Sequence, residues 1–242
     1  DGIRDLVRSR GLGDVYKRQI LFDLDGTLFD YDISESNALK NTFKDFNLPF
    51  KDHVIPTYRE LNARLWKQFE EGTLSQKIIK IRRFEQLGAA LDLTFDAEEF
   101  SHKYLLHLSE GTDLIDGARD MIELLSKSTD MVLITNGLTI VQRPRIKNSG
   151  LEKYFREIII SEEVGAAKPD TKIFDIAFMR LGYPAKNETL IVGDSLTSDI
   201  AGGINYGIDT CWFNPNNVNG NNDLDYTYEI KALMNLRDIL FF

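Results

Sequence analysis

The chain contains a single cysteine, Cys211, among its 242 residues. A lone cysteine excludes an internal disulfide framework and favours a reducing compartment. Long apolar runs are also missing: none approaches the length of a transmembrane helix, and none has the form of a secretory signal. We therefore expect a cytoplasmic protein without a membrane partner, and we expect Cys211 to be a small core residue in a strand.

Basic residues are fewer than acidic residues. The 29 lysines and arginines face 38 aspartates and glutamates, which gives a formal net charge of -9. Nucleic-acid polymers and anionic membranes need an electrostatic attraction that such a surface opposes, so we expect neither as a partner. The composition still allows a small anionic substrate, provided that a metal and local donors neutralise it.

Residues 1–19 differ in composition from the rest of the chain. They are rich in basic residues and show no regular spacing of apolar residues. The acidic residues among them argue against a transit peptide. The stretch 10–19 also resembles translated linker sequence. We therefore expect residues 1–19 to be either non-native sequence or a leader outside the folded domains.

The segment 34–111 is predicted to be helical throughout. Leu61, Leu65 and Phe69 fall four residues apart, which is typical of the buried stripe of an amphipathic helix. No alternating strand pattern interrupts this stretch. It therefore reads as a helical module inserted between the first strand and the remainder of the chain.

From residue 112 onward, short apolar strands alternate with helices. With the first strand at 20–22, the strands are predicted at 131–134, 158–160, 189–192 and 210–213. This alternation favours an α/β fold with a Rossmann-like, doubly wound parallel sheet formed by residues 20–33 and 112–242. The segment 34–111 would be its cap. Such sheets bind ligands beyond the carboxyl ends of their strands.

Two carboxylates follow the first strand. Asp23 and Asp25 stand two residues apart, and Gly26 then turns the chain away. Alternation along an extended strand would direct both side chains to one side. Two close carboxylates are unfavourable unless a cation lies between them or one keeps its proton, so we interpret the pair as a functional site.

Three later strand ends also carry polar groups. Thr135 and Asn136 follow the second strand, and Lys168 lies in the loop after the third. Asp194 and Asp199 follow the fourth. Alone, the first pair would be an ordinary turn, Lys168 a solvated lysine, and the last two helix caps. In a doubly wound sheet all three groups would meet Asp23 and Asp25 at one crevice.

These four segments, in this order, resemble the four signatures of the haloacid dehalogenase superfamily, and the likeness covers roughly residues 20–242. The resemblance implies that Asp23 is a nucleophile that forms an aspartyl-phosphate. It implies that Asp25 protonates the leaving oxygen and later activates water. Dehalogenases of the superfamily lack this second aspartate, so Asp25 points to phosphoryl chemistry.

The resemblance also implies a cofactor and its ligands. Mg²⁺ would be held by Asp23, the backbone carbonyl of Asp25, and Asp194, with Asp199 outside the direct ligands. Three further groups would cradle the phosphoryl oxygens. They are the Thr135 hydroxyl, the Asn136 backbone N–H and the Lys168 ammonium.

A finer resemblance concerns the substrate. The run 160–175 is similar to the bacterial pyrimidine 5′-nucleotidases of the superfamily, as are 202–205, 210–214 and the pattern Asn62, Leu65, Trp66, Gly72, Arg83 and Phe84 in the cap. This predicts a pyrimidine nucleoside monophosphatase, either a monomer or a homodimer. A sugar-phosphate phosphatase similar to those acting on acylneuraminate 9-phosphates, a phosphomutase and a non-catalytic phosphate-ligand-binding protein remain alternatives. Among the aromatic residues, Phe29, Tyr31 and Trp66 are equal candidates to face the substrate.

Overall fold

A six-stranded sheet forms the centre of the core domain. The computed structural model describes residues 17–220 and 224–240. All strand pairs in the sheet are parallel, in the order β3-β2-β1-β4-β5-β6, which confirms the predicted doubly wound topology. The strands are β1 (Gln19–Phe22), β2 (Asp130–Thr135), β3 (Glu157–Ile160), β4 (Thr189–Gly193), β5 (Asp209–Phe213) and β6 (Tyr228–Ile230).

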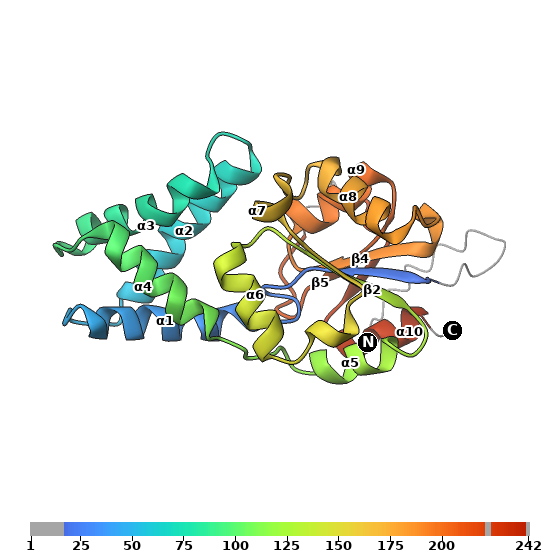
Figure 1. The fold of residues 1–242 in the computed structure, drawn as a ribbon, viewed down its shortest axis with the longest axis horizontal. Helices are drawn as coiled ribbons and strands as arrows, with labels where there is room; N and C mark the ends of the chain where they lie inside the picture. Colours follow the sequence, from blue (N-terminus) through green and yellow to red (C-terminus); the bar gives the residue numbers. More distant parts are fainter. Residues whose placement is uncertain (1–16, 221–223, 241–242) are drawn as a thin grey trace.

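Helices cover both faces of this sheet (Figure 1). In β1, Ile20 and Phe22 pack on one face and Leu21 on the other, as the alternation of a strand requires. The first face is covered by α5 (Ala118–Leu125) and α10 (Leu236–Leu240), and the second by α8 (Thr171–Leu181) and α9 (Ala201–Tyr206). Burial on both faces explains why these strands read as continuous apolar runs.

The remaining core elements are short. The helix following β2, α6, runs over Thr139–Asn148 and contains Pro144. Gly150, with a φ of 73°, follows shortly after the end of this helix. The others are α7 (Ser161–Val164), the single turns η1 (Glu152–Tyr154), η2 (Lys186–Glu188) and η4 (Leu233–Asn235), and a π-helical turn, η3 (Leu196–Ile200).

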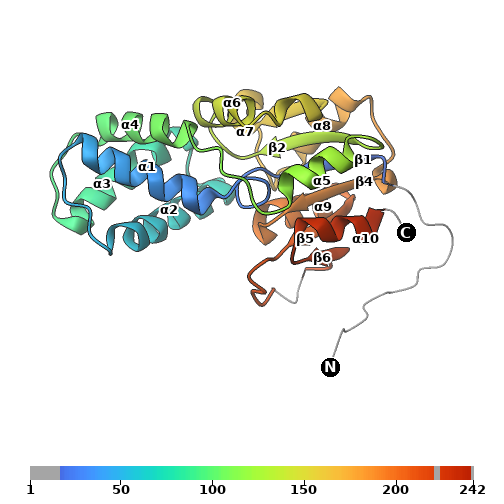
Figure 2. The ribbon, with the colours of Figure 1, turned by 90° about the horizontal axis from the view of Figure 1, so that it is seen from below.

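Four helices form the cap, which extends from one end of the core (Figures 1 and 2). Its aromatic core includes Phe43, Phe84 and Phe100, and Leu138 and Val141 from the start of α6 join it. Within residues 17–220 and 224–240, no helix combines the length and the apolar character needed to cross a membrane. The cap helices are α1 (Tyr31–Asp45), α2 (Val54–Glu70), α3 (Gln76–Leu91) and α4 (Ala97–Ser109).

The folded core begins earlier than the predicted leader boundary at residue 19. Lys17 is buried, and its ammonium lies 2.5 Å from a carboxylate oxygen of Asp209. Arg18 donates its backbone N–H to the Glu188 carbonyl at 2.9 Å, and Gln19 belongs to β1. Residues 17–19 are therefore part of the core domain, whereas the linker-like stretch up to residue 16 lies outside the described residues.

Candidate active site

The candidate site lies where β1 and β4 run side by side. Phe22 pairs with Val192, and the Asp23 N–H donates to the Val192 carbonyl at 2.9 Å. Strand order reverses between these two neighbours, since β2 and β3 continue to one side and β5 and β6 to the other. The carboxyl ends of strands at such a reversal form a crevice, and the segments after β1 and β4 therefore meet there.

Three carboxylates converge in this crevice. One oxygen from each of Asp23, Asp194 and Asp199 lies within 4.8 Å of the other two. Two glycines permit this approach: a Cβ on Gly26 would lie 2.5 Å from an Asp194 oxygen, and one on Gly193 would lie 2.2 Å from an Asp199 oxygen. Asp199, which the resemblance places outside the direct ligands, also contributes an oxygen to this cluster.

Lys168 lies in the middle of the carboxylates. Its buried ammonium is 2.5 Å from Asp23 Oδ1 and 2.6 Å from Asp199 Oδ1, and it donates to the Ile134 carbonyl at 2.7 Å. Burial favours the neutral amine, but the attraction of Asp199 and Asp23 is stronger and raises the pKa of Lys168 above its ordinary value. The lysine therefore remains a cation at neutral pH.

The Asn136 side chain positions this lysine. Its amide donates to the Lys168 carbonyl and accepts from the Lys168 N–H, both at 2.8 Å. The sequence analysis assigned a role only to the backbone N–H of Asn136. The contact of its side chain with Lys168 is an additional finding. Thr135 is buried at the end of β2, and its Oγ accepts from the Gly137 N–H at 3.1 Å and from the Gln142 amide at 3.2 Å.

The charge of the cluster fits a divalent cation. Three carboxylates against one ammonium leave a formal charge of about -2 when all are ionised. Burial, followed by repulsion from Asp199, raises the pKa of Asp23 well above its ordinary value, and the same causes raise the pKa of Asp194 to about 7. A hard cation with oxygen ligands, such as Mg²⁺ or Ca²⁺, would relieve this repulsion.

Asp25 does not face the cluster of carboxylates, contrary to the alternation prediction. Its carboxylate pairs with the Arg145 guanidinium and accepts from the Gln142 amide at 2.6 Å. The reason is local: β1 ends at Phe22, so strand alternation no longer governs Asp25. Gly26, with a φ of 84°, then turns the chain back toward the cap.

Arg145 joins Asp25 to both connections of the cap. It is fully buried, donates to the Gly111 carbonyl at 2.8 Å after α4, and contacts the Ser34 hydroxyl at 3.5 Å in the first turns of α1. Its guanidinium lies 4.7 Å from the centroid of the Phe29 ring. Sequence reasoning missed Arg145 and Gln142, whose only signal is their spacing of three residues on one helix, which places both on one face.

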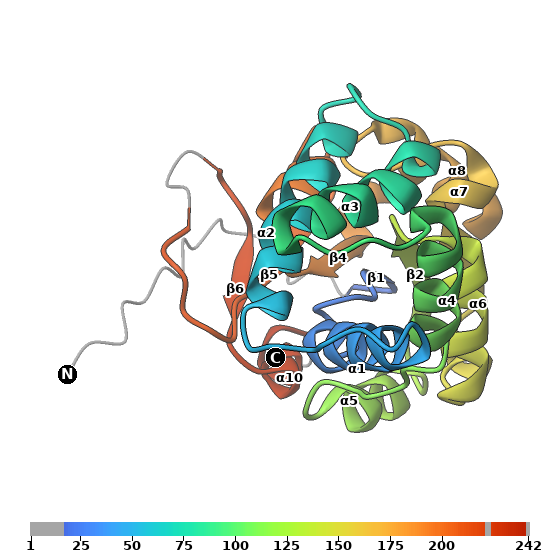
Figure 3. The same cartoon turned by 90° about the vertical axis from the view of Figure 1, so that its left-hand side faces the viewer.

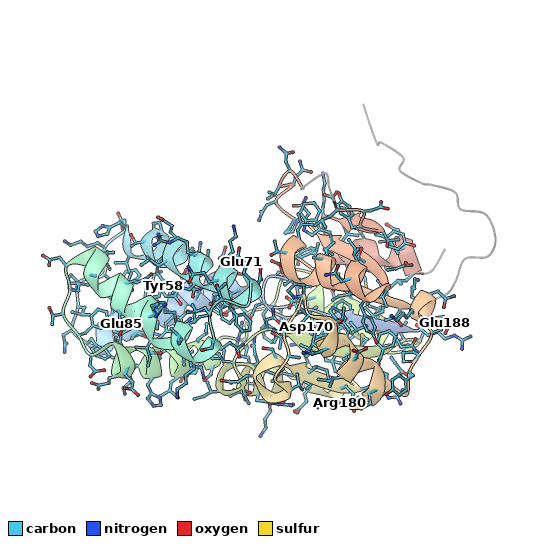
Figure 4. The ribbon with its side chains drawn as sticks, turned by 90° about the horizontal axis from the view of Figure 1, so that it is seen from above. Tyr58, Glu71, Glu85, Asp170, Arg180 and Glu188 are labelled. Carbon is cyan, nitrogen blue, oxygen red and sulfur yellow. The ribbon has the colours of Figure 1, made fainter. Side chains whose placement is uncertain are left out.

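The cap closes over the crevice through polar contacts. The Gln76 amide, at the start of α3, donates to the Asn136 carbonyl at 2.7 Å and to the Ser161 hydroxyl at 3.0 Å. At the end of α2, Glu70 accepts from the Thr197 hydroxyl at 2.8 Å. Figure 4 shows the neighbouring Glu71 at the part of the cap nearest the core. The two ends of the α2–α3 turn therefore lie against the loops that follow β2, β3 and β4.

The chain is similar to known proteins over nearly its whole length. The YfnB protein of Bacillus subtilis, named a HAD-hydrolase, is 38% identical over 223 residues, which cover 92% of this chain and 95% of YfnB. The pyrimidine 5′-nucleotidases PynA of Streptococcus pneumoniae and YjjG of Escherichia coli are 33% and 32% identical. These alignments cover 93% and 91% of this chain, and 96% of each relative.

A solved structure of YfnB, described as bound to magnesium and as revealing interdomain movement, superimposes with a TM-score of 0.90 at 37% identity. It covers 94% of this chain and 100% of the YfnB chain. The family model for haloacid dehalogenase-like hydrolases matches residues 20–213, a range that includes all four motif segments. As the motifs predicted, the chain belongs to the haloacid dehalogenase-like hydrolases.

Proposed function

We propose that the protein is a phosphomonoester hydrolase that acts through an aspartyl-phosphate on Asp23. The observation that carries this proposal is the convergence of Asp23, Asp194, Asp199 and Lys168 at one crevice, where all but Asp194 are buried. A phosphoryl group entering the crevice would meet the Asp23 carboxylate together with the positive charge that its oxygens require. The family membership and the Asp25 side chain support the same reaction class.

The reaction has two displacements at phosphorus. In the first, an Asp23 oxygen bonds to phosphorus, the bond to the leaving oxygen breaks, and Asp25 donates a proton to that oxygen. In the second, Asp25 takes a proton from water, whose oxygen bonds to phosphorus and releases phosphate from Asp23. Because Asp25 faces Arg145 and Gln142, its side chain has to turn toward the crevice for both transfers.

Asp23, Asp194 and Asp199 are the residues that would hold Mg²⁺, together with the Asp25 carbonyl. When bound, the ion would offset negative charge on the carboxylates and on the phosphoryl oxygens. The magnesium in the relative YfnB supports this choice of cation. The Thr135 hydroxyl, the Asn136 N–H and the Lys168 ammonium would bind the phosphoryl oxygens.

We propose pyrimidine nucleoside monophosphates as the substrates. The names of PynA and YjjG, which align with nearly the whole chain, support this class. The closed cap also supports it, because the crevice has to enclose a leaving group beyond the phosphate. The protein would act on a small molecule in the cytoplasm as a monomer or homodimer, as the sequence predicts.

A substrate panel tests the proposal directly. Phosphate release would be measured from UMP, dUMP, dTMP, AMP and several sugar phosphates, with MgCl₂ and with EDTA. We expect release from the pyrimidine monophosphates, with loss of activity in EDTA. Isomerised sugar phosphate without free phosphate would instead identify a phosphomutase. Tight binding without turnover would identify a non-catalytic protein.

A further inference from the structure

A buried arginine lies among aromatic side chains inside the cap. Arg83, on α3, is only 2% exposed. Its Nη1 donates to the Tyr58 hydroxyl at 3.1 Å and to the Asn62 amide oxygen at 3.4 Å. The Phe84 and Tyr104 rings lie near the guanidinium carbon, with centroids at 4.9 Å and 4.8 Å. The aromatic rings therefore pack against the guanidinium, and one of its nitrogens is satisfied.

The other edge of the guanidinium is not satisfied. Within the described residues, Arg83 Nε and Nη2 are buried and have no hydrogen-bond acceptor. Glu35, a carboxylate whose charge acts on Arg83, pairs instead with Arg59 at 2.7 Å. Buried donors without acceptors are unfavourable. The Nε and Nη2 edge of a guanidinium presents two parallel N–H groups, a geometry that suits the acceptor edge of a planar ligand.

Arg83 lies on α3, the cap helix whose first residue, Gln76, contacts the core. Arg83 follows Gln76 by seven residues, which places it about 10 Å further along the same side of α3. Gln76 itself contacts the Asn136 carbonyl. Side chains on a helix lean toward its N-terminus, so Arg83 leans toward the core. Figure 3 looks from the cap onto the sheet and shows the carboxyl ends of β1 and β4 between the four cap helices.

Tyr31 connects the two regions. It begins α1, six residues after Asp25, and packs against the cap cluster that contains Tyr58 and Tyr104. Tyr31 is also close enough to both Asp25 and Arg83 for their charges to act on its hydroxyl, so we expect the leaving group of a phosphate at Asp23 to extend past Tyr31 toward Arg83. The distance along α3 exceeds the reach of a small triose but suits the length of a nucleoside.

Resting on the pyrimidine monophosphatase activity proposed above, we propose that Arg83 forms the base subsite of the enzyme. Its Nε–H and Nη2–H donate to the carbonyl oxygen at C2 of the pyrimidine, an acceptor that uracil, thymine and cytosine share. The neighbouring aromatic rings provide apolar contact for the base. Adenine and guanine have no carbonyl at C2, so the subsite selects pyrimidines.

The test compares two substrates on the same enzyme preparation. Values of kcat/KM would be measured for UMP and for ribose 5-phosphate, which is the same sugar phosphate without the base. The variants are Arg83→Met, Arg83→Lys and the matched control Arg82→Met, which makes the same change one residue earlier at an exposed position. The ratio of the two values cancels any difference in folded fraction, which circular dichroism would monitor independently.

We expect Arg83→Met to lower the ratio of UMP to ribose 5-phosphate by at least about tenfold, because a site built around a hydrogen bond discriminates strongly. Arg83→Lys should restore the ratio only in part, since it keeps the charge but lacks the two parallel donors. Arg82→Met should match the wild type. An unchanged ratio in Arg83→Met would overturn the subsite. Failure of the proposed function would differ: the wild type itself would then release no phosphate from UMP.

Discussion

Lys168 Nζ lies 2.5 Å from Asp23 Oδ1, although 145 residues separate the two in the chain. The contact brings together the ends of β1 and of the loop after β3, and it is buried on both sides. Asp199 completes it at 2.6 Å from the same ammonium. One cation therefore offsets two carboxylates, so loss of the cation should be more destabilising than loss of either carboxylate.

Replacement of Lys168 with Met should reduce both activity and stability. The variant keeps the length of the side chain but leaves Asp23 and Asp199 buried without their cation. We expect kcat to fall by roughly 10²–10³-fold, as for the loss of one charge-stabilising donor. The free energy of unfolding should fall by about 3–5 kcal/mol. Initial rates and urea denaturation measure these two quantities.

Lys172→Met is the matched control, because the Lys172 side chain is 76% exposed and should contribute little. The double variant Asp23→Asn/Lys168→Met should recover part of the lost stability, since it removes one of the two uncompensated charges. An equal loss of stability in the two lysine variants would contradict the buried ion pair.

Replacement of Asp23 with Asn should abolish turnover while the fold is kept. The amide has the shape of the carboxylate but lacks the attacking charge, so we expect a loss of roughly 10⁴-fold or more in kcat. In metal-free protein the variant should be at least as stable as the wild type, since it removes a charge that is unfavourable because of its burial and its repulsion from Asp199 and Asp194. Asp120→Asn, at an exposed carboxylate of α5, is the control. Substantial remaining turnover in Asp23→Asn would exclude covalent catalysis at this residue.

The stabilisation by Mg²⁺ should grow with pH. Asp194 has a folded-state pKa of about 7 against an ordinary value of 3.8, so the folded protein without metal binds the proton more tightly than the unfolded chain. The free energy of unfolding of the metal-free protein should therefore decrease as pH rises between these two values. Because a metal competes with the proton, the rise in Tm on adding MgCl₂ should be larger near pH 8 than near pH 6.

Thermal denaturation at both pH values, with MgCl₂ and with EDTA, measures this effect. Asp194→Asn should reduce both the rise in Tm and its dependence on pH, because the titrating ligand is lost. A rise in Tm that is the same at both pH values in the wild type would show that the carboxylates are ionised without the metal.

Arg145 and Arg143 offer a comparison within one helix. Arg145 is fully buried and pairs with Asp25, whereas the Arg143 side chain is 42% exposed and pairs with Glu163 at 2.6 Å. Arg145→Met should lower the free energy of unfolding by about 3–5 kcal/mol, since it leaves the partly buried Asp25 carboxylate without its cation. Arg143→Met should lower it by less than about 1 kcal/mol. Urea denaturation of both variants decides between these values, and equal losses would contradict the assigned difference in burial.

The fold was predictable because its signals are local. The strands after residue 130 read as short apolar runs, and the structure places them in one parallel sheet. The positions of Asp23, Thr135 and Asp194 followed from the turn residues that end each strand. Local rules also have exceptions: a proline is unfavourable inside a helix, but α6 contains Pro144.

The arrangement of the site was less predictable because it depends on long-range contacts. Asp199 stands with Asp23 and Asp194 because the turn after β4 is wound as a π-helix, and its carboxylate accepts from the Ser195 N–H at 3.1 Å. Asp25 lies against Arg145, which comes from a helix 120 residues later. No regular spacing of residues in the sequence indicates either of these contacts.

By itself, the sequence determined the kinds of side chain at each strand end and the alternation that builds a parallel sheet, because both depend on neighbouring residues. Only the tertiary structure decided which of these groups meet. The reversal of strand order between β1 and β4 brings Asp23 to Asp194, and the cap brings Gln76 and Arg83 toward the crevice. Burial then raises the pKa values of two aspartates, an effect that has no counterpart in an unfolded chain.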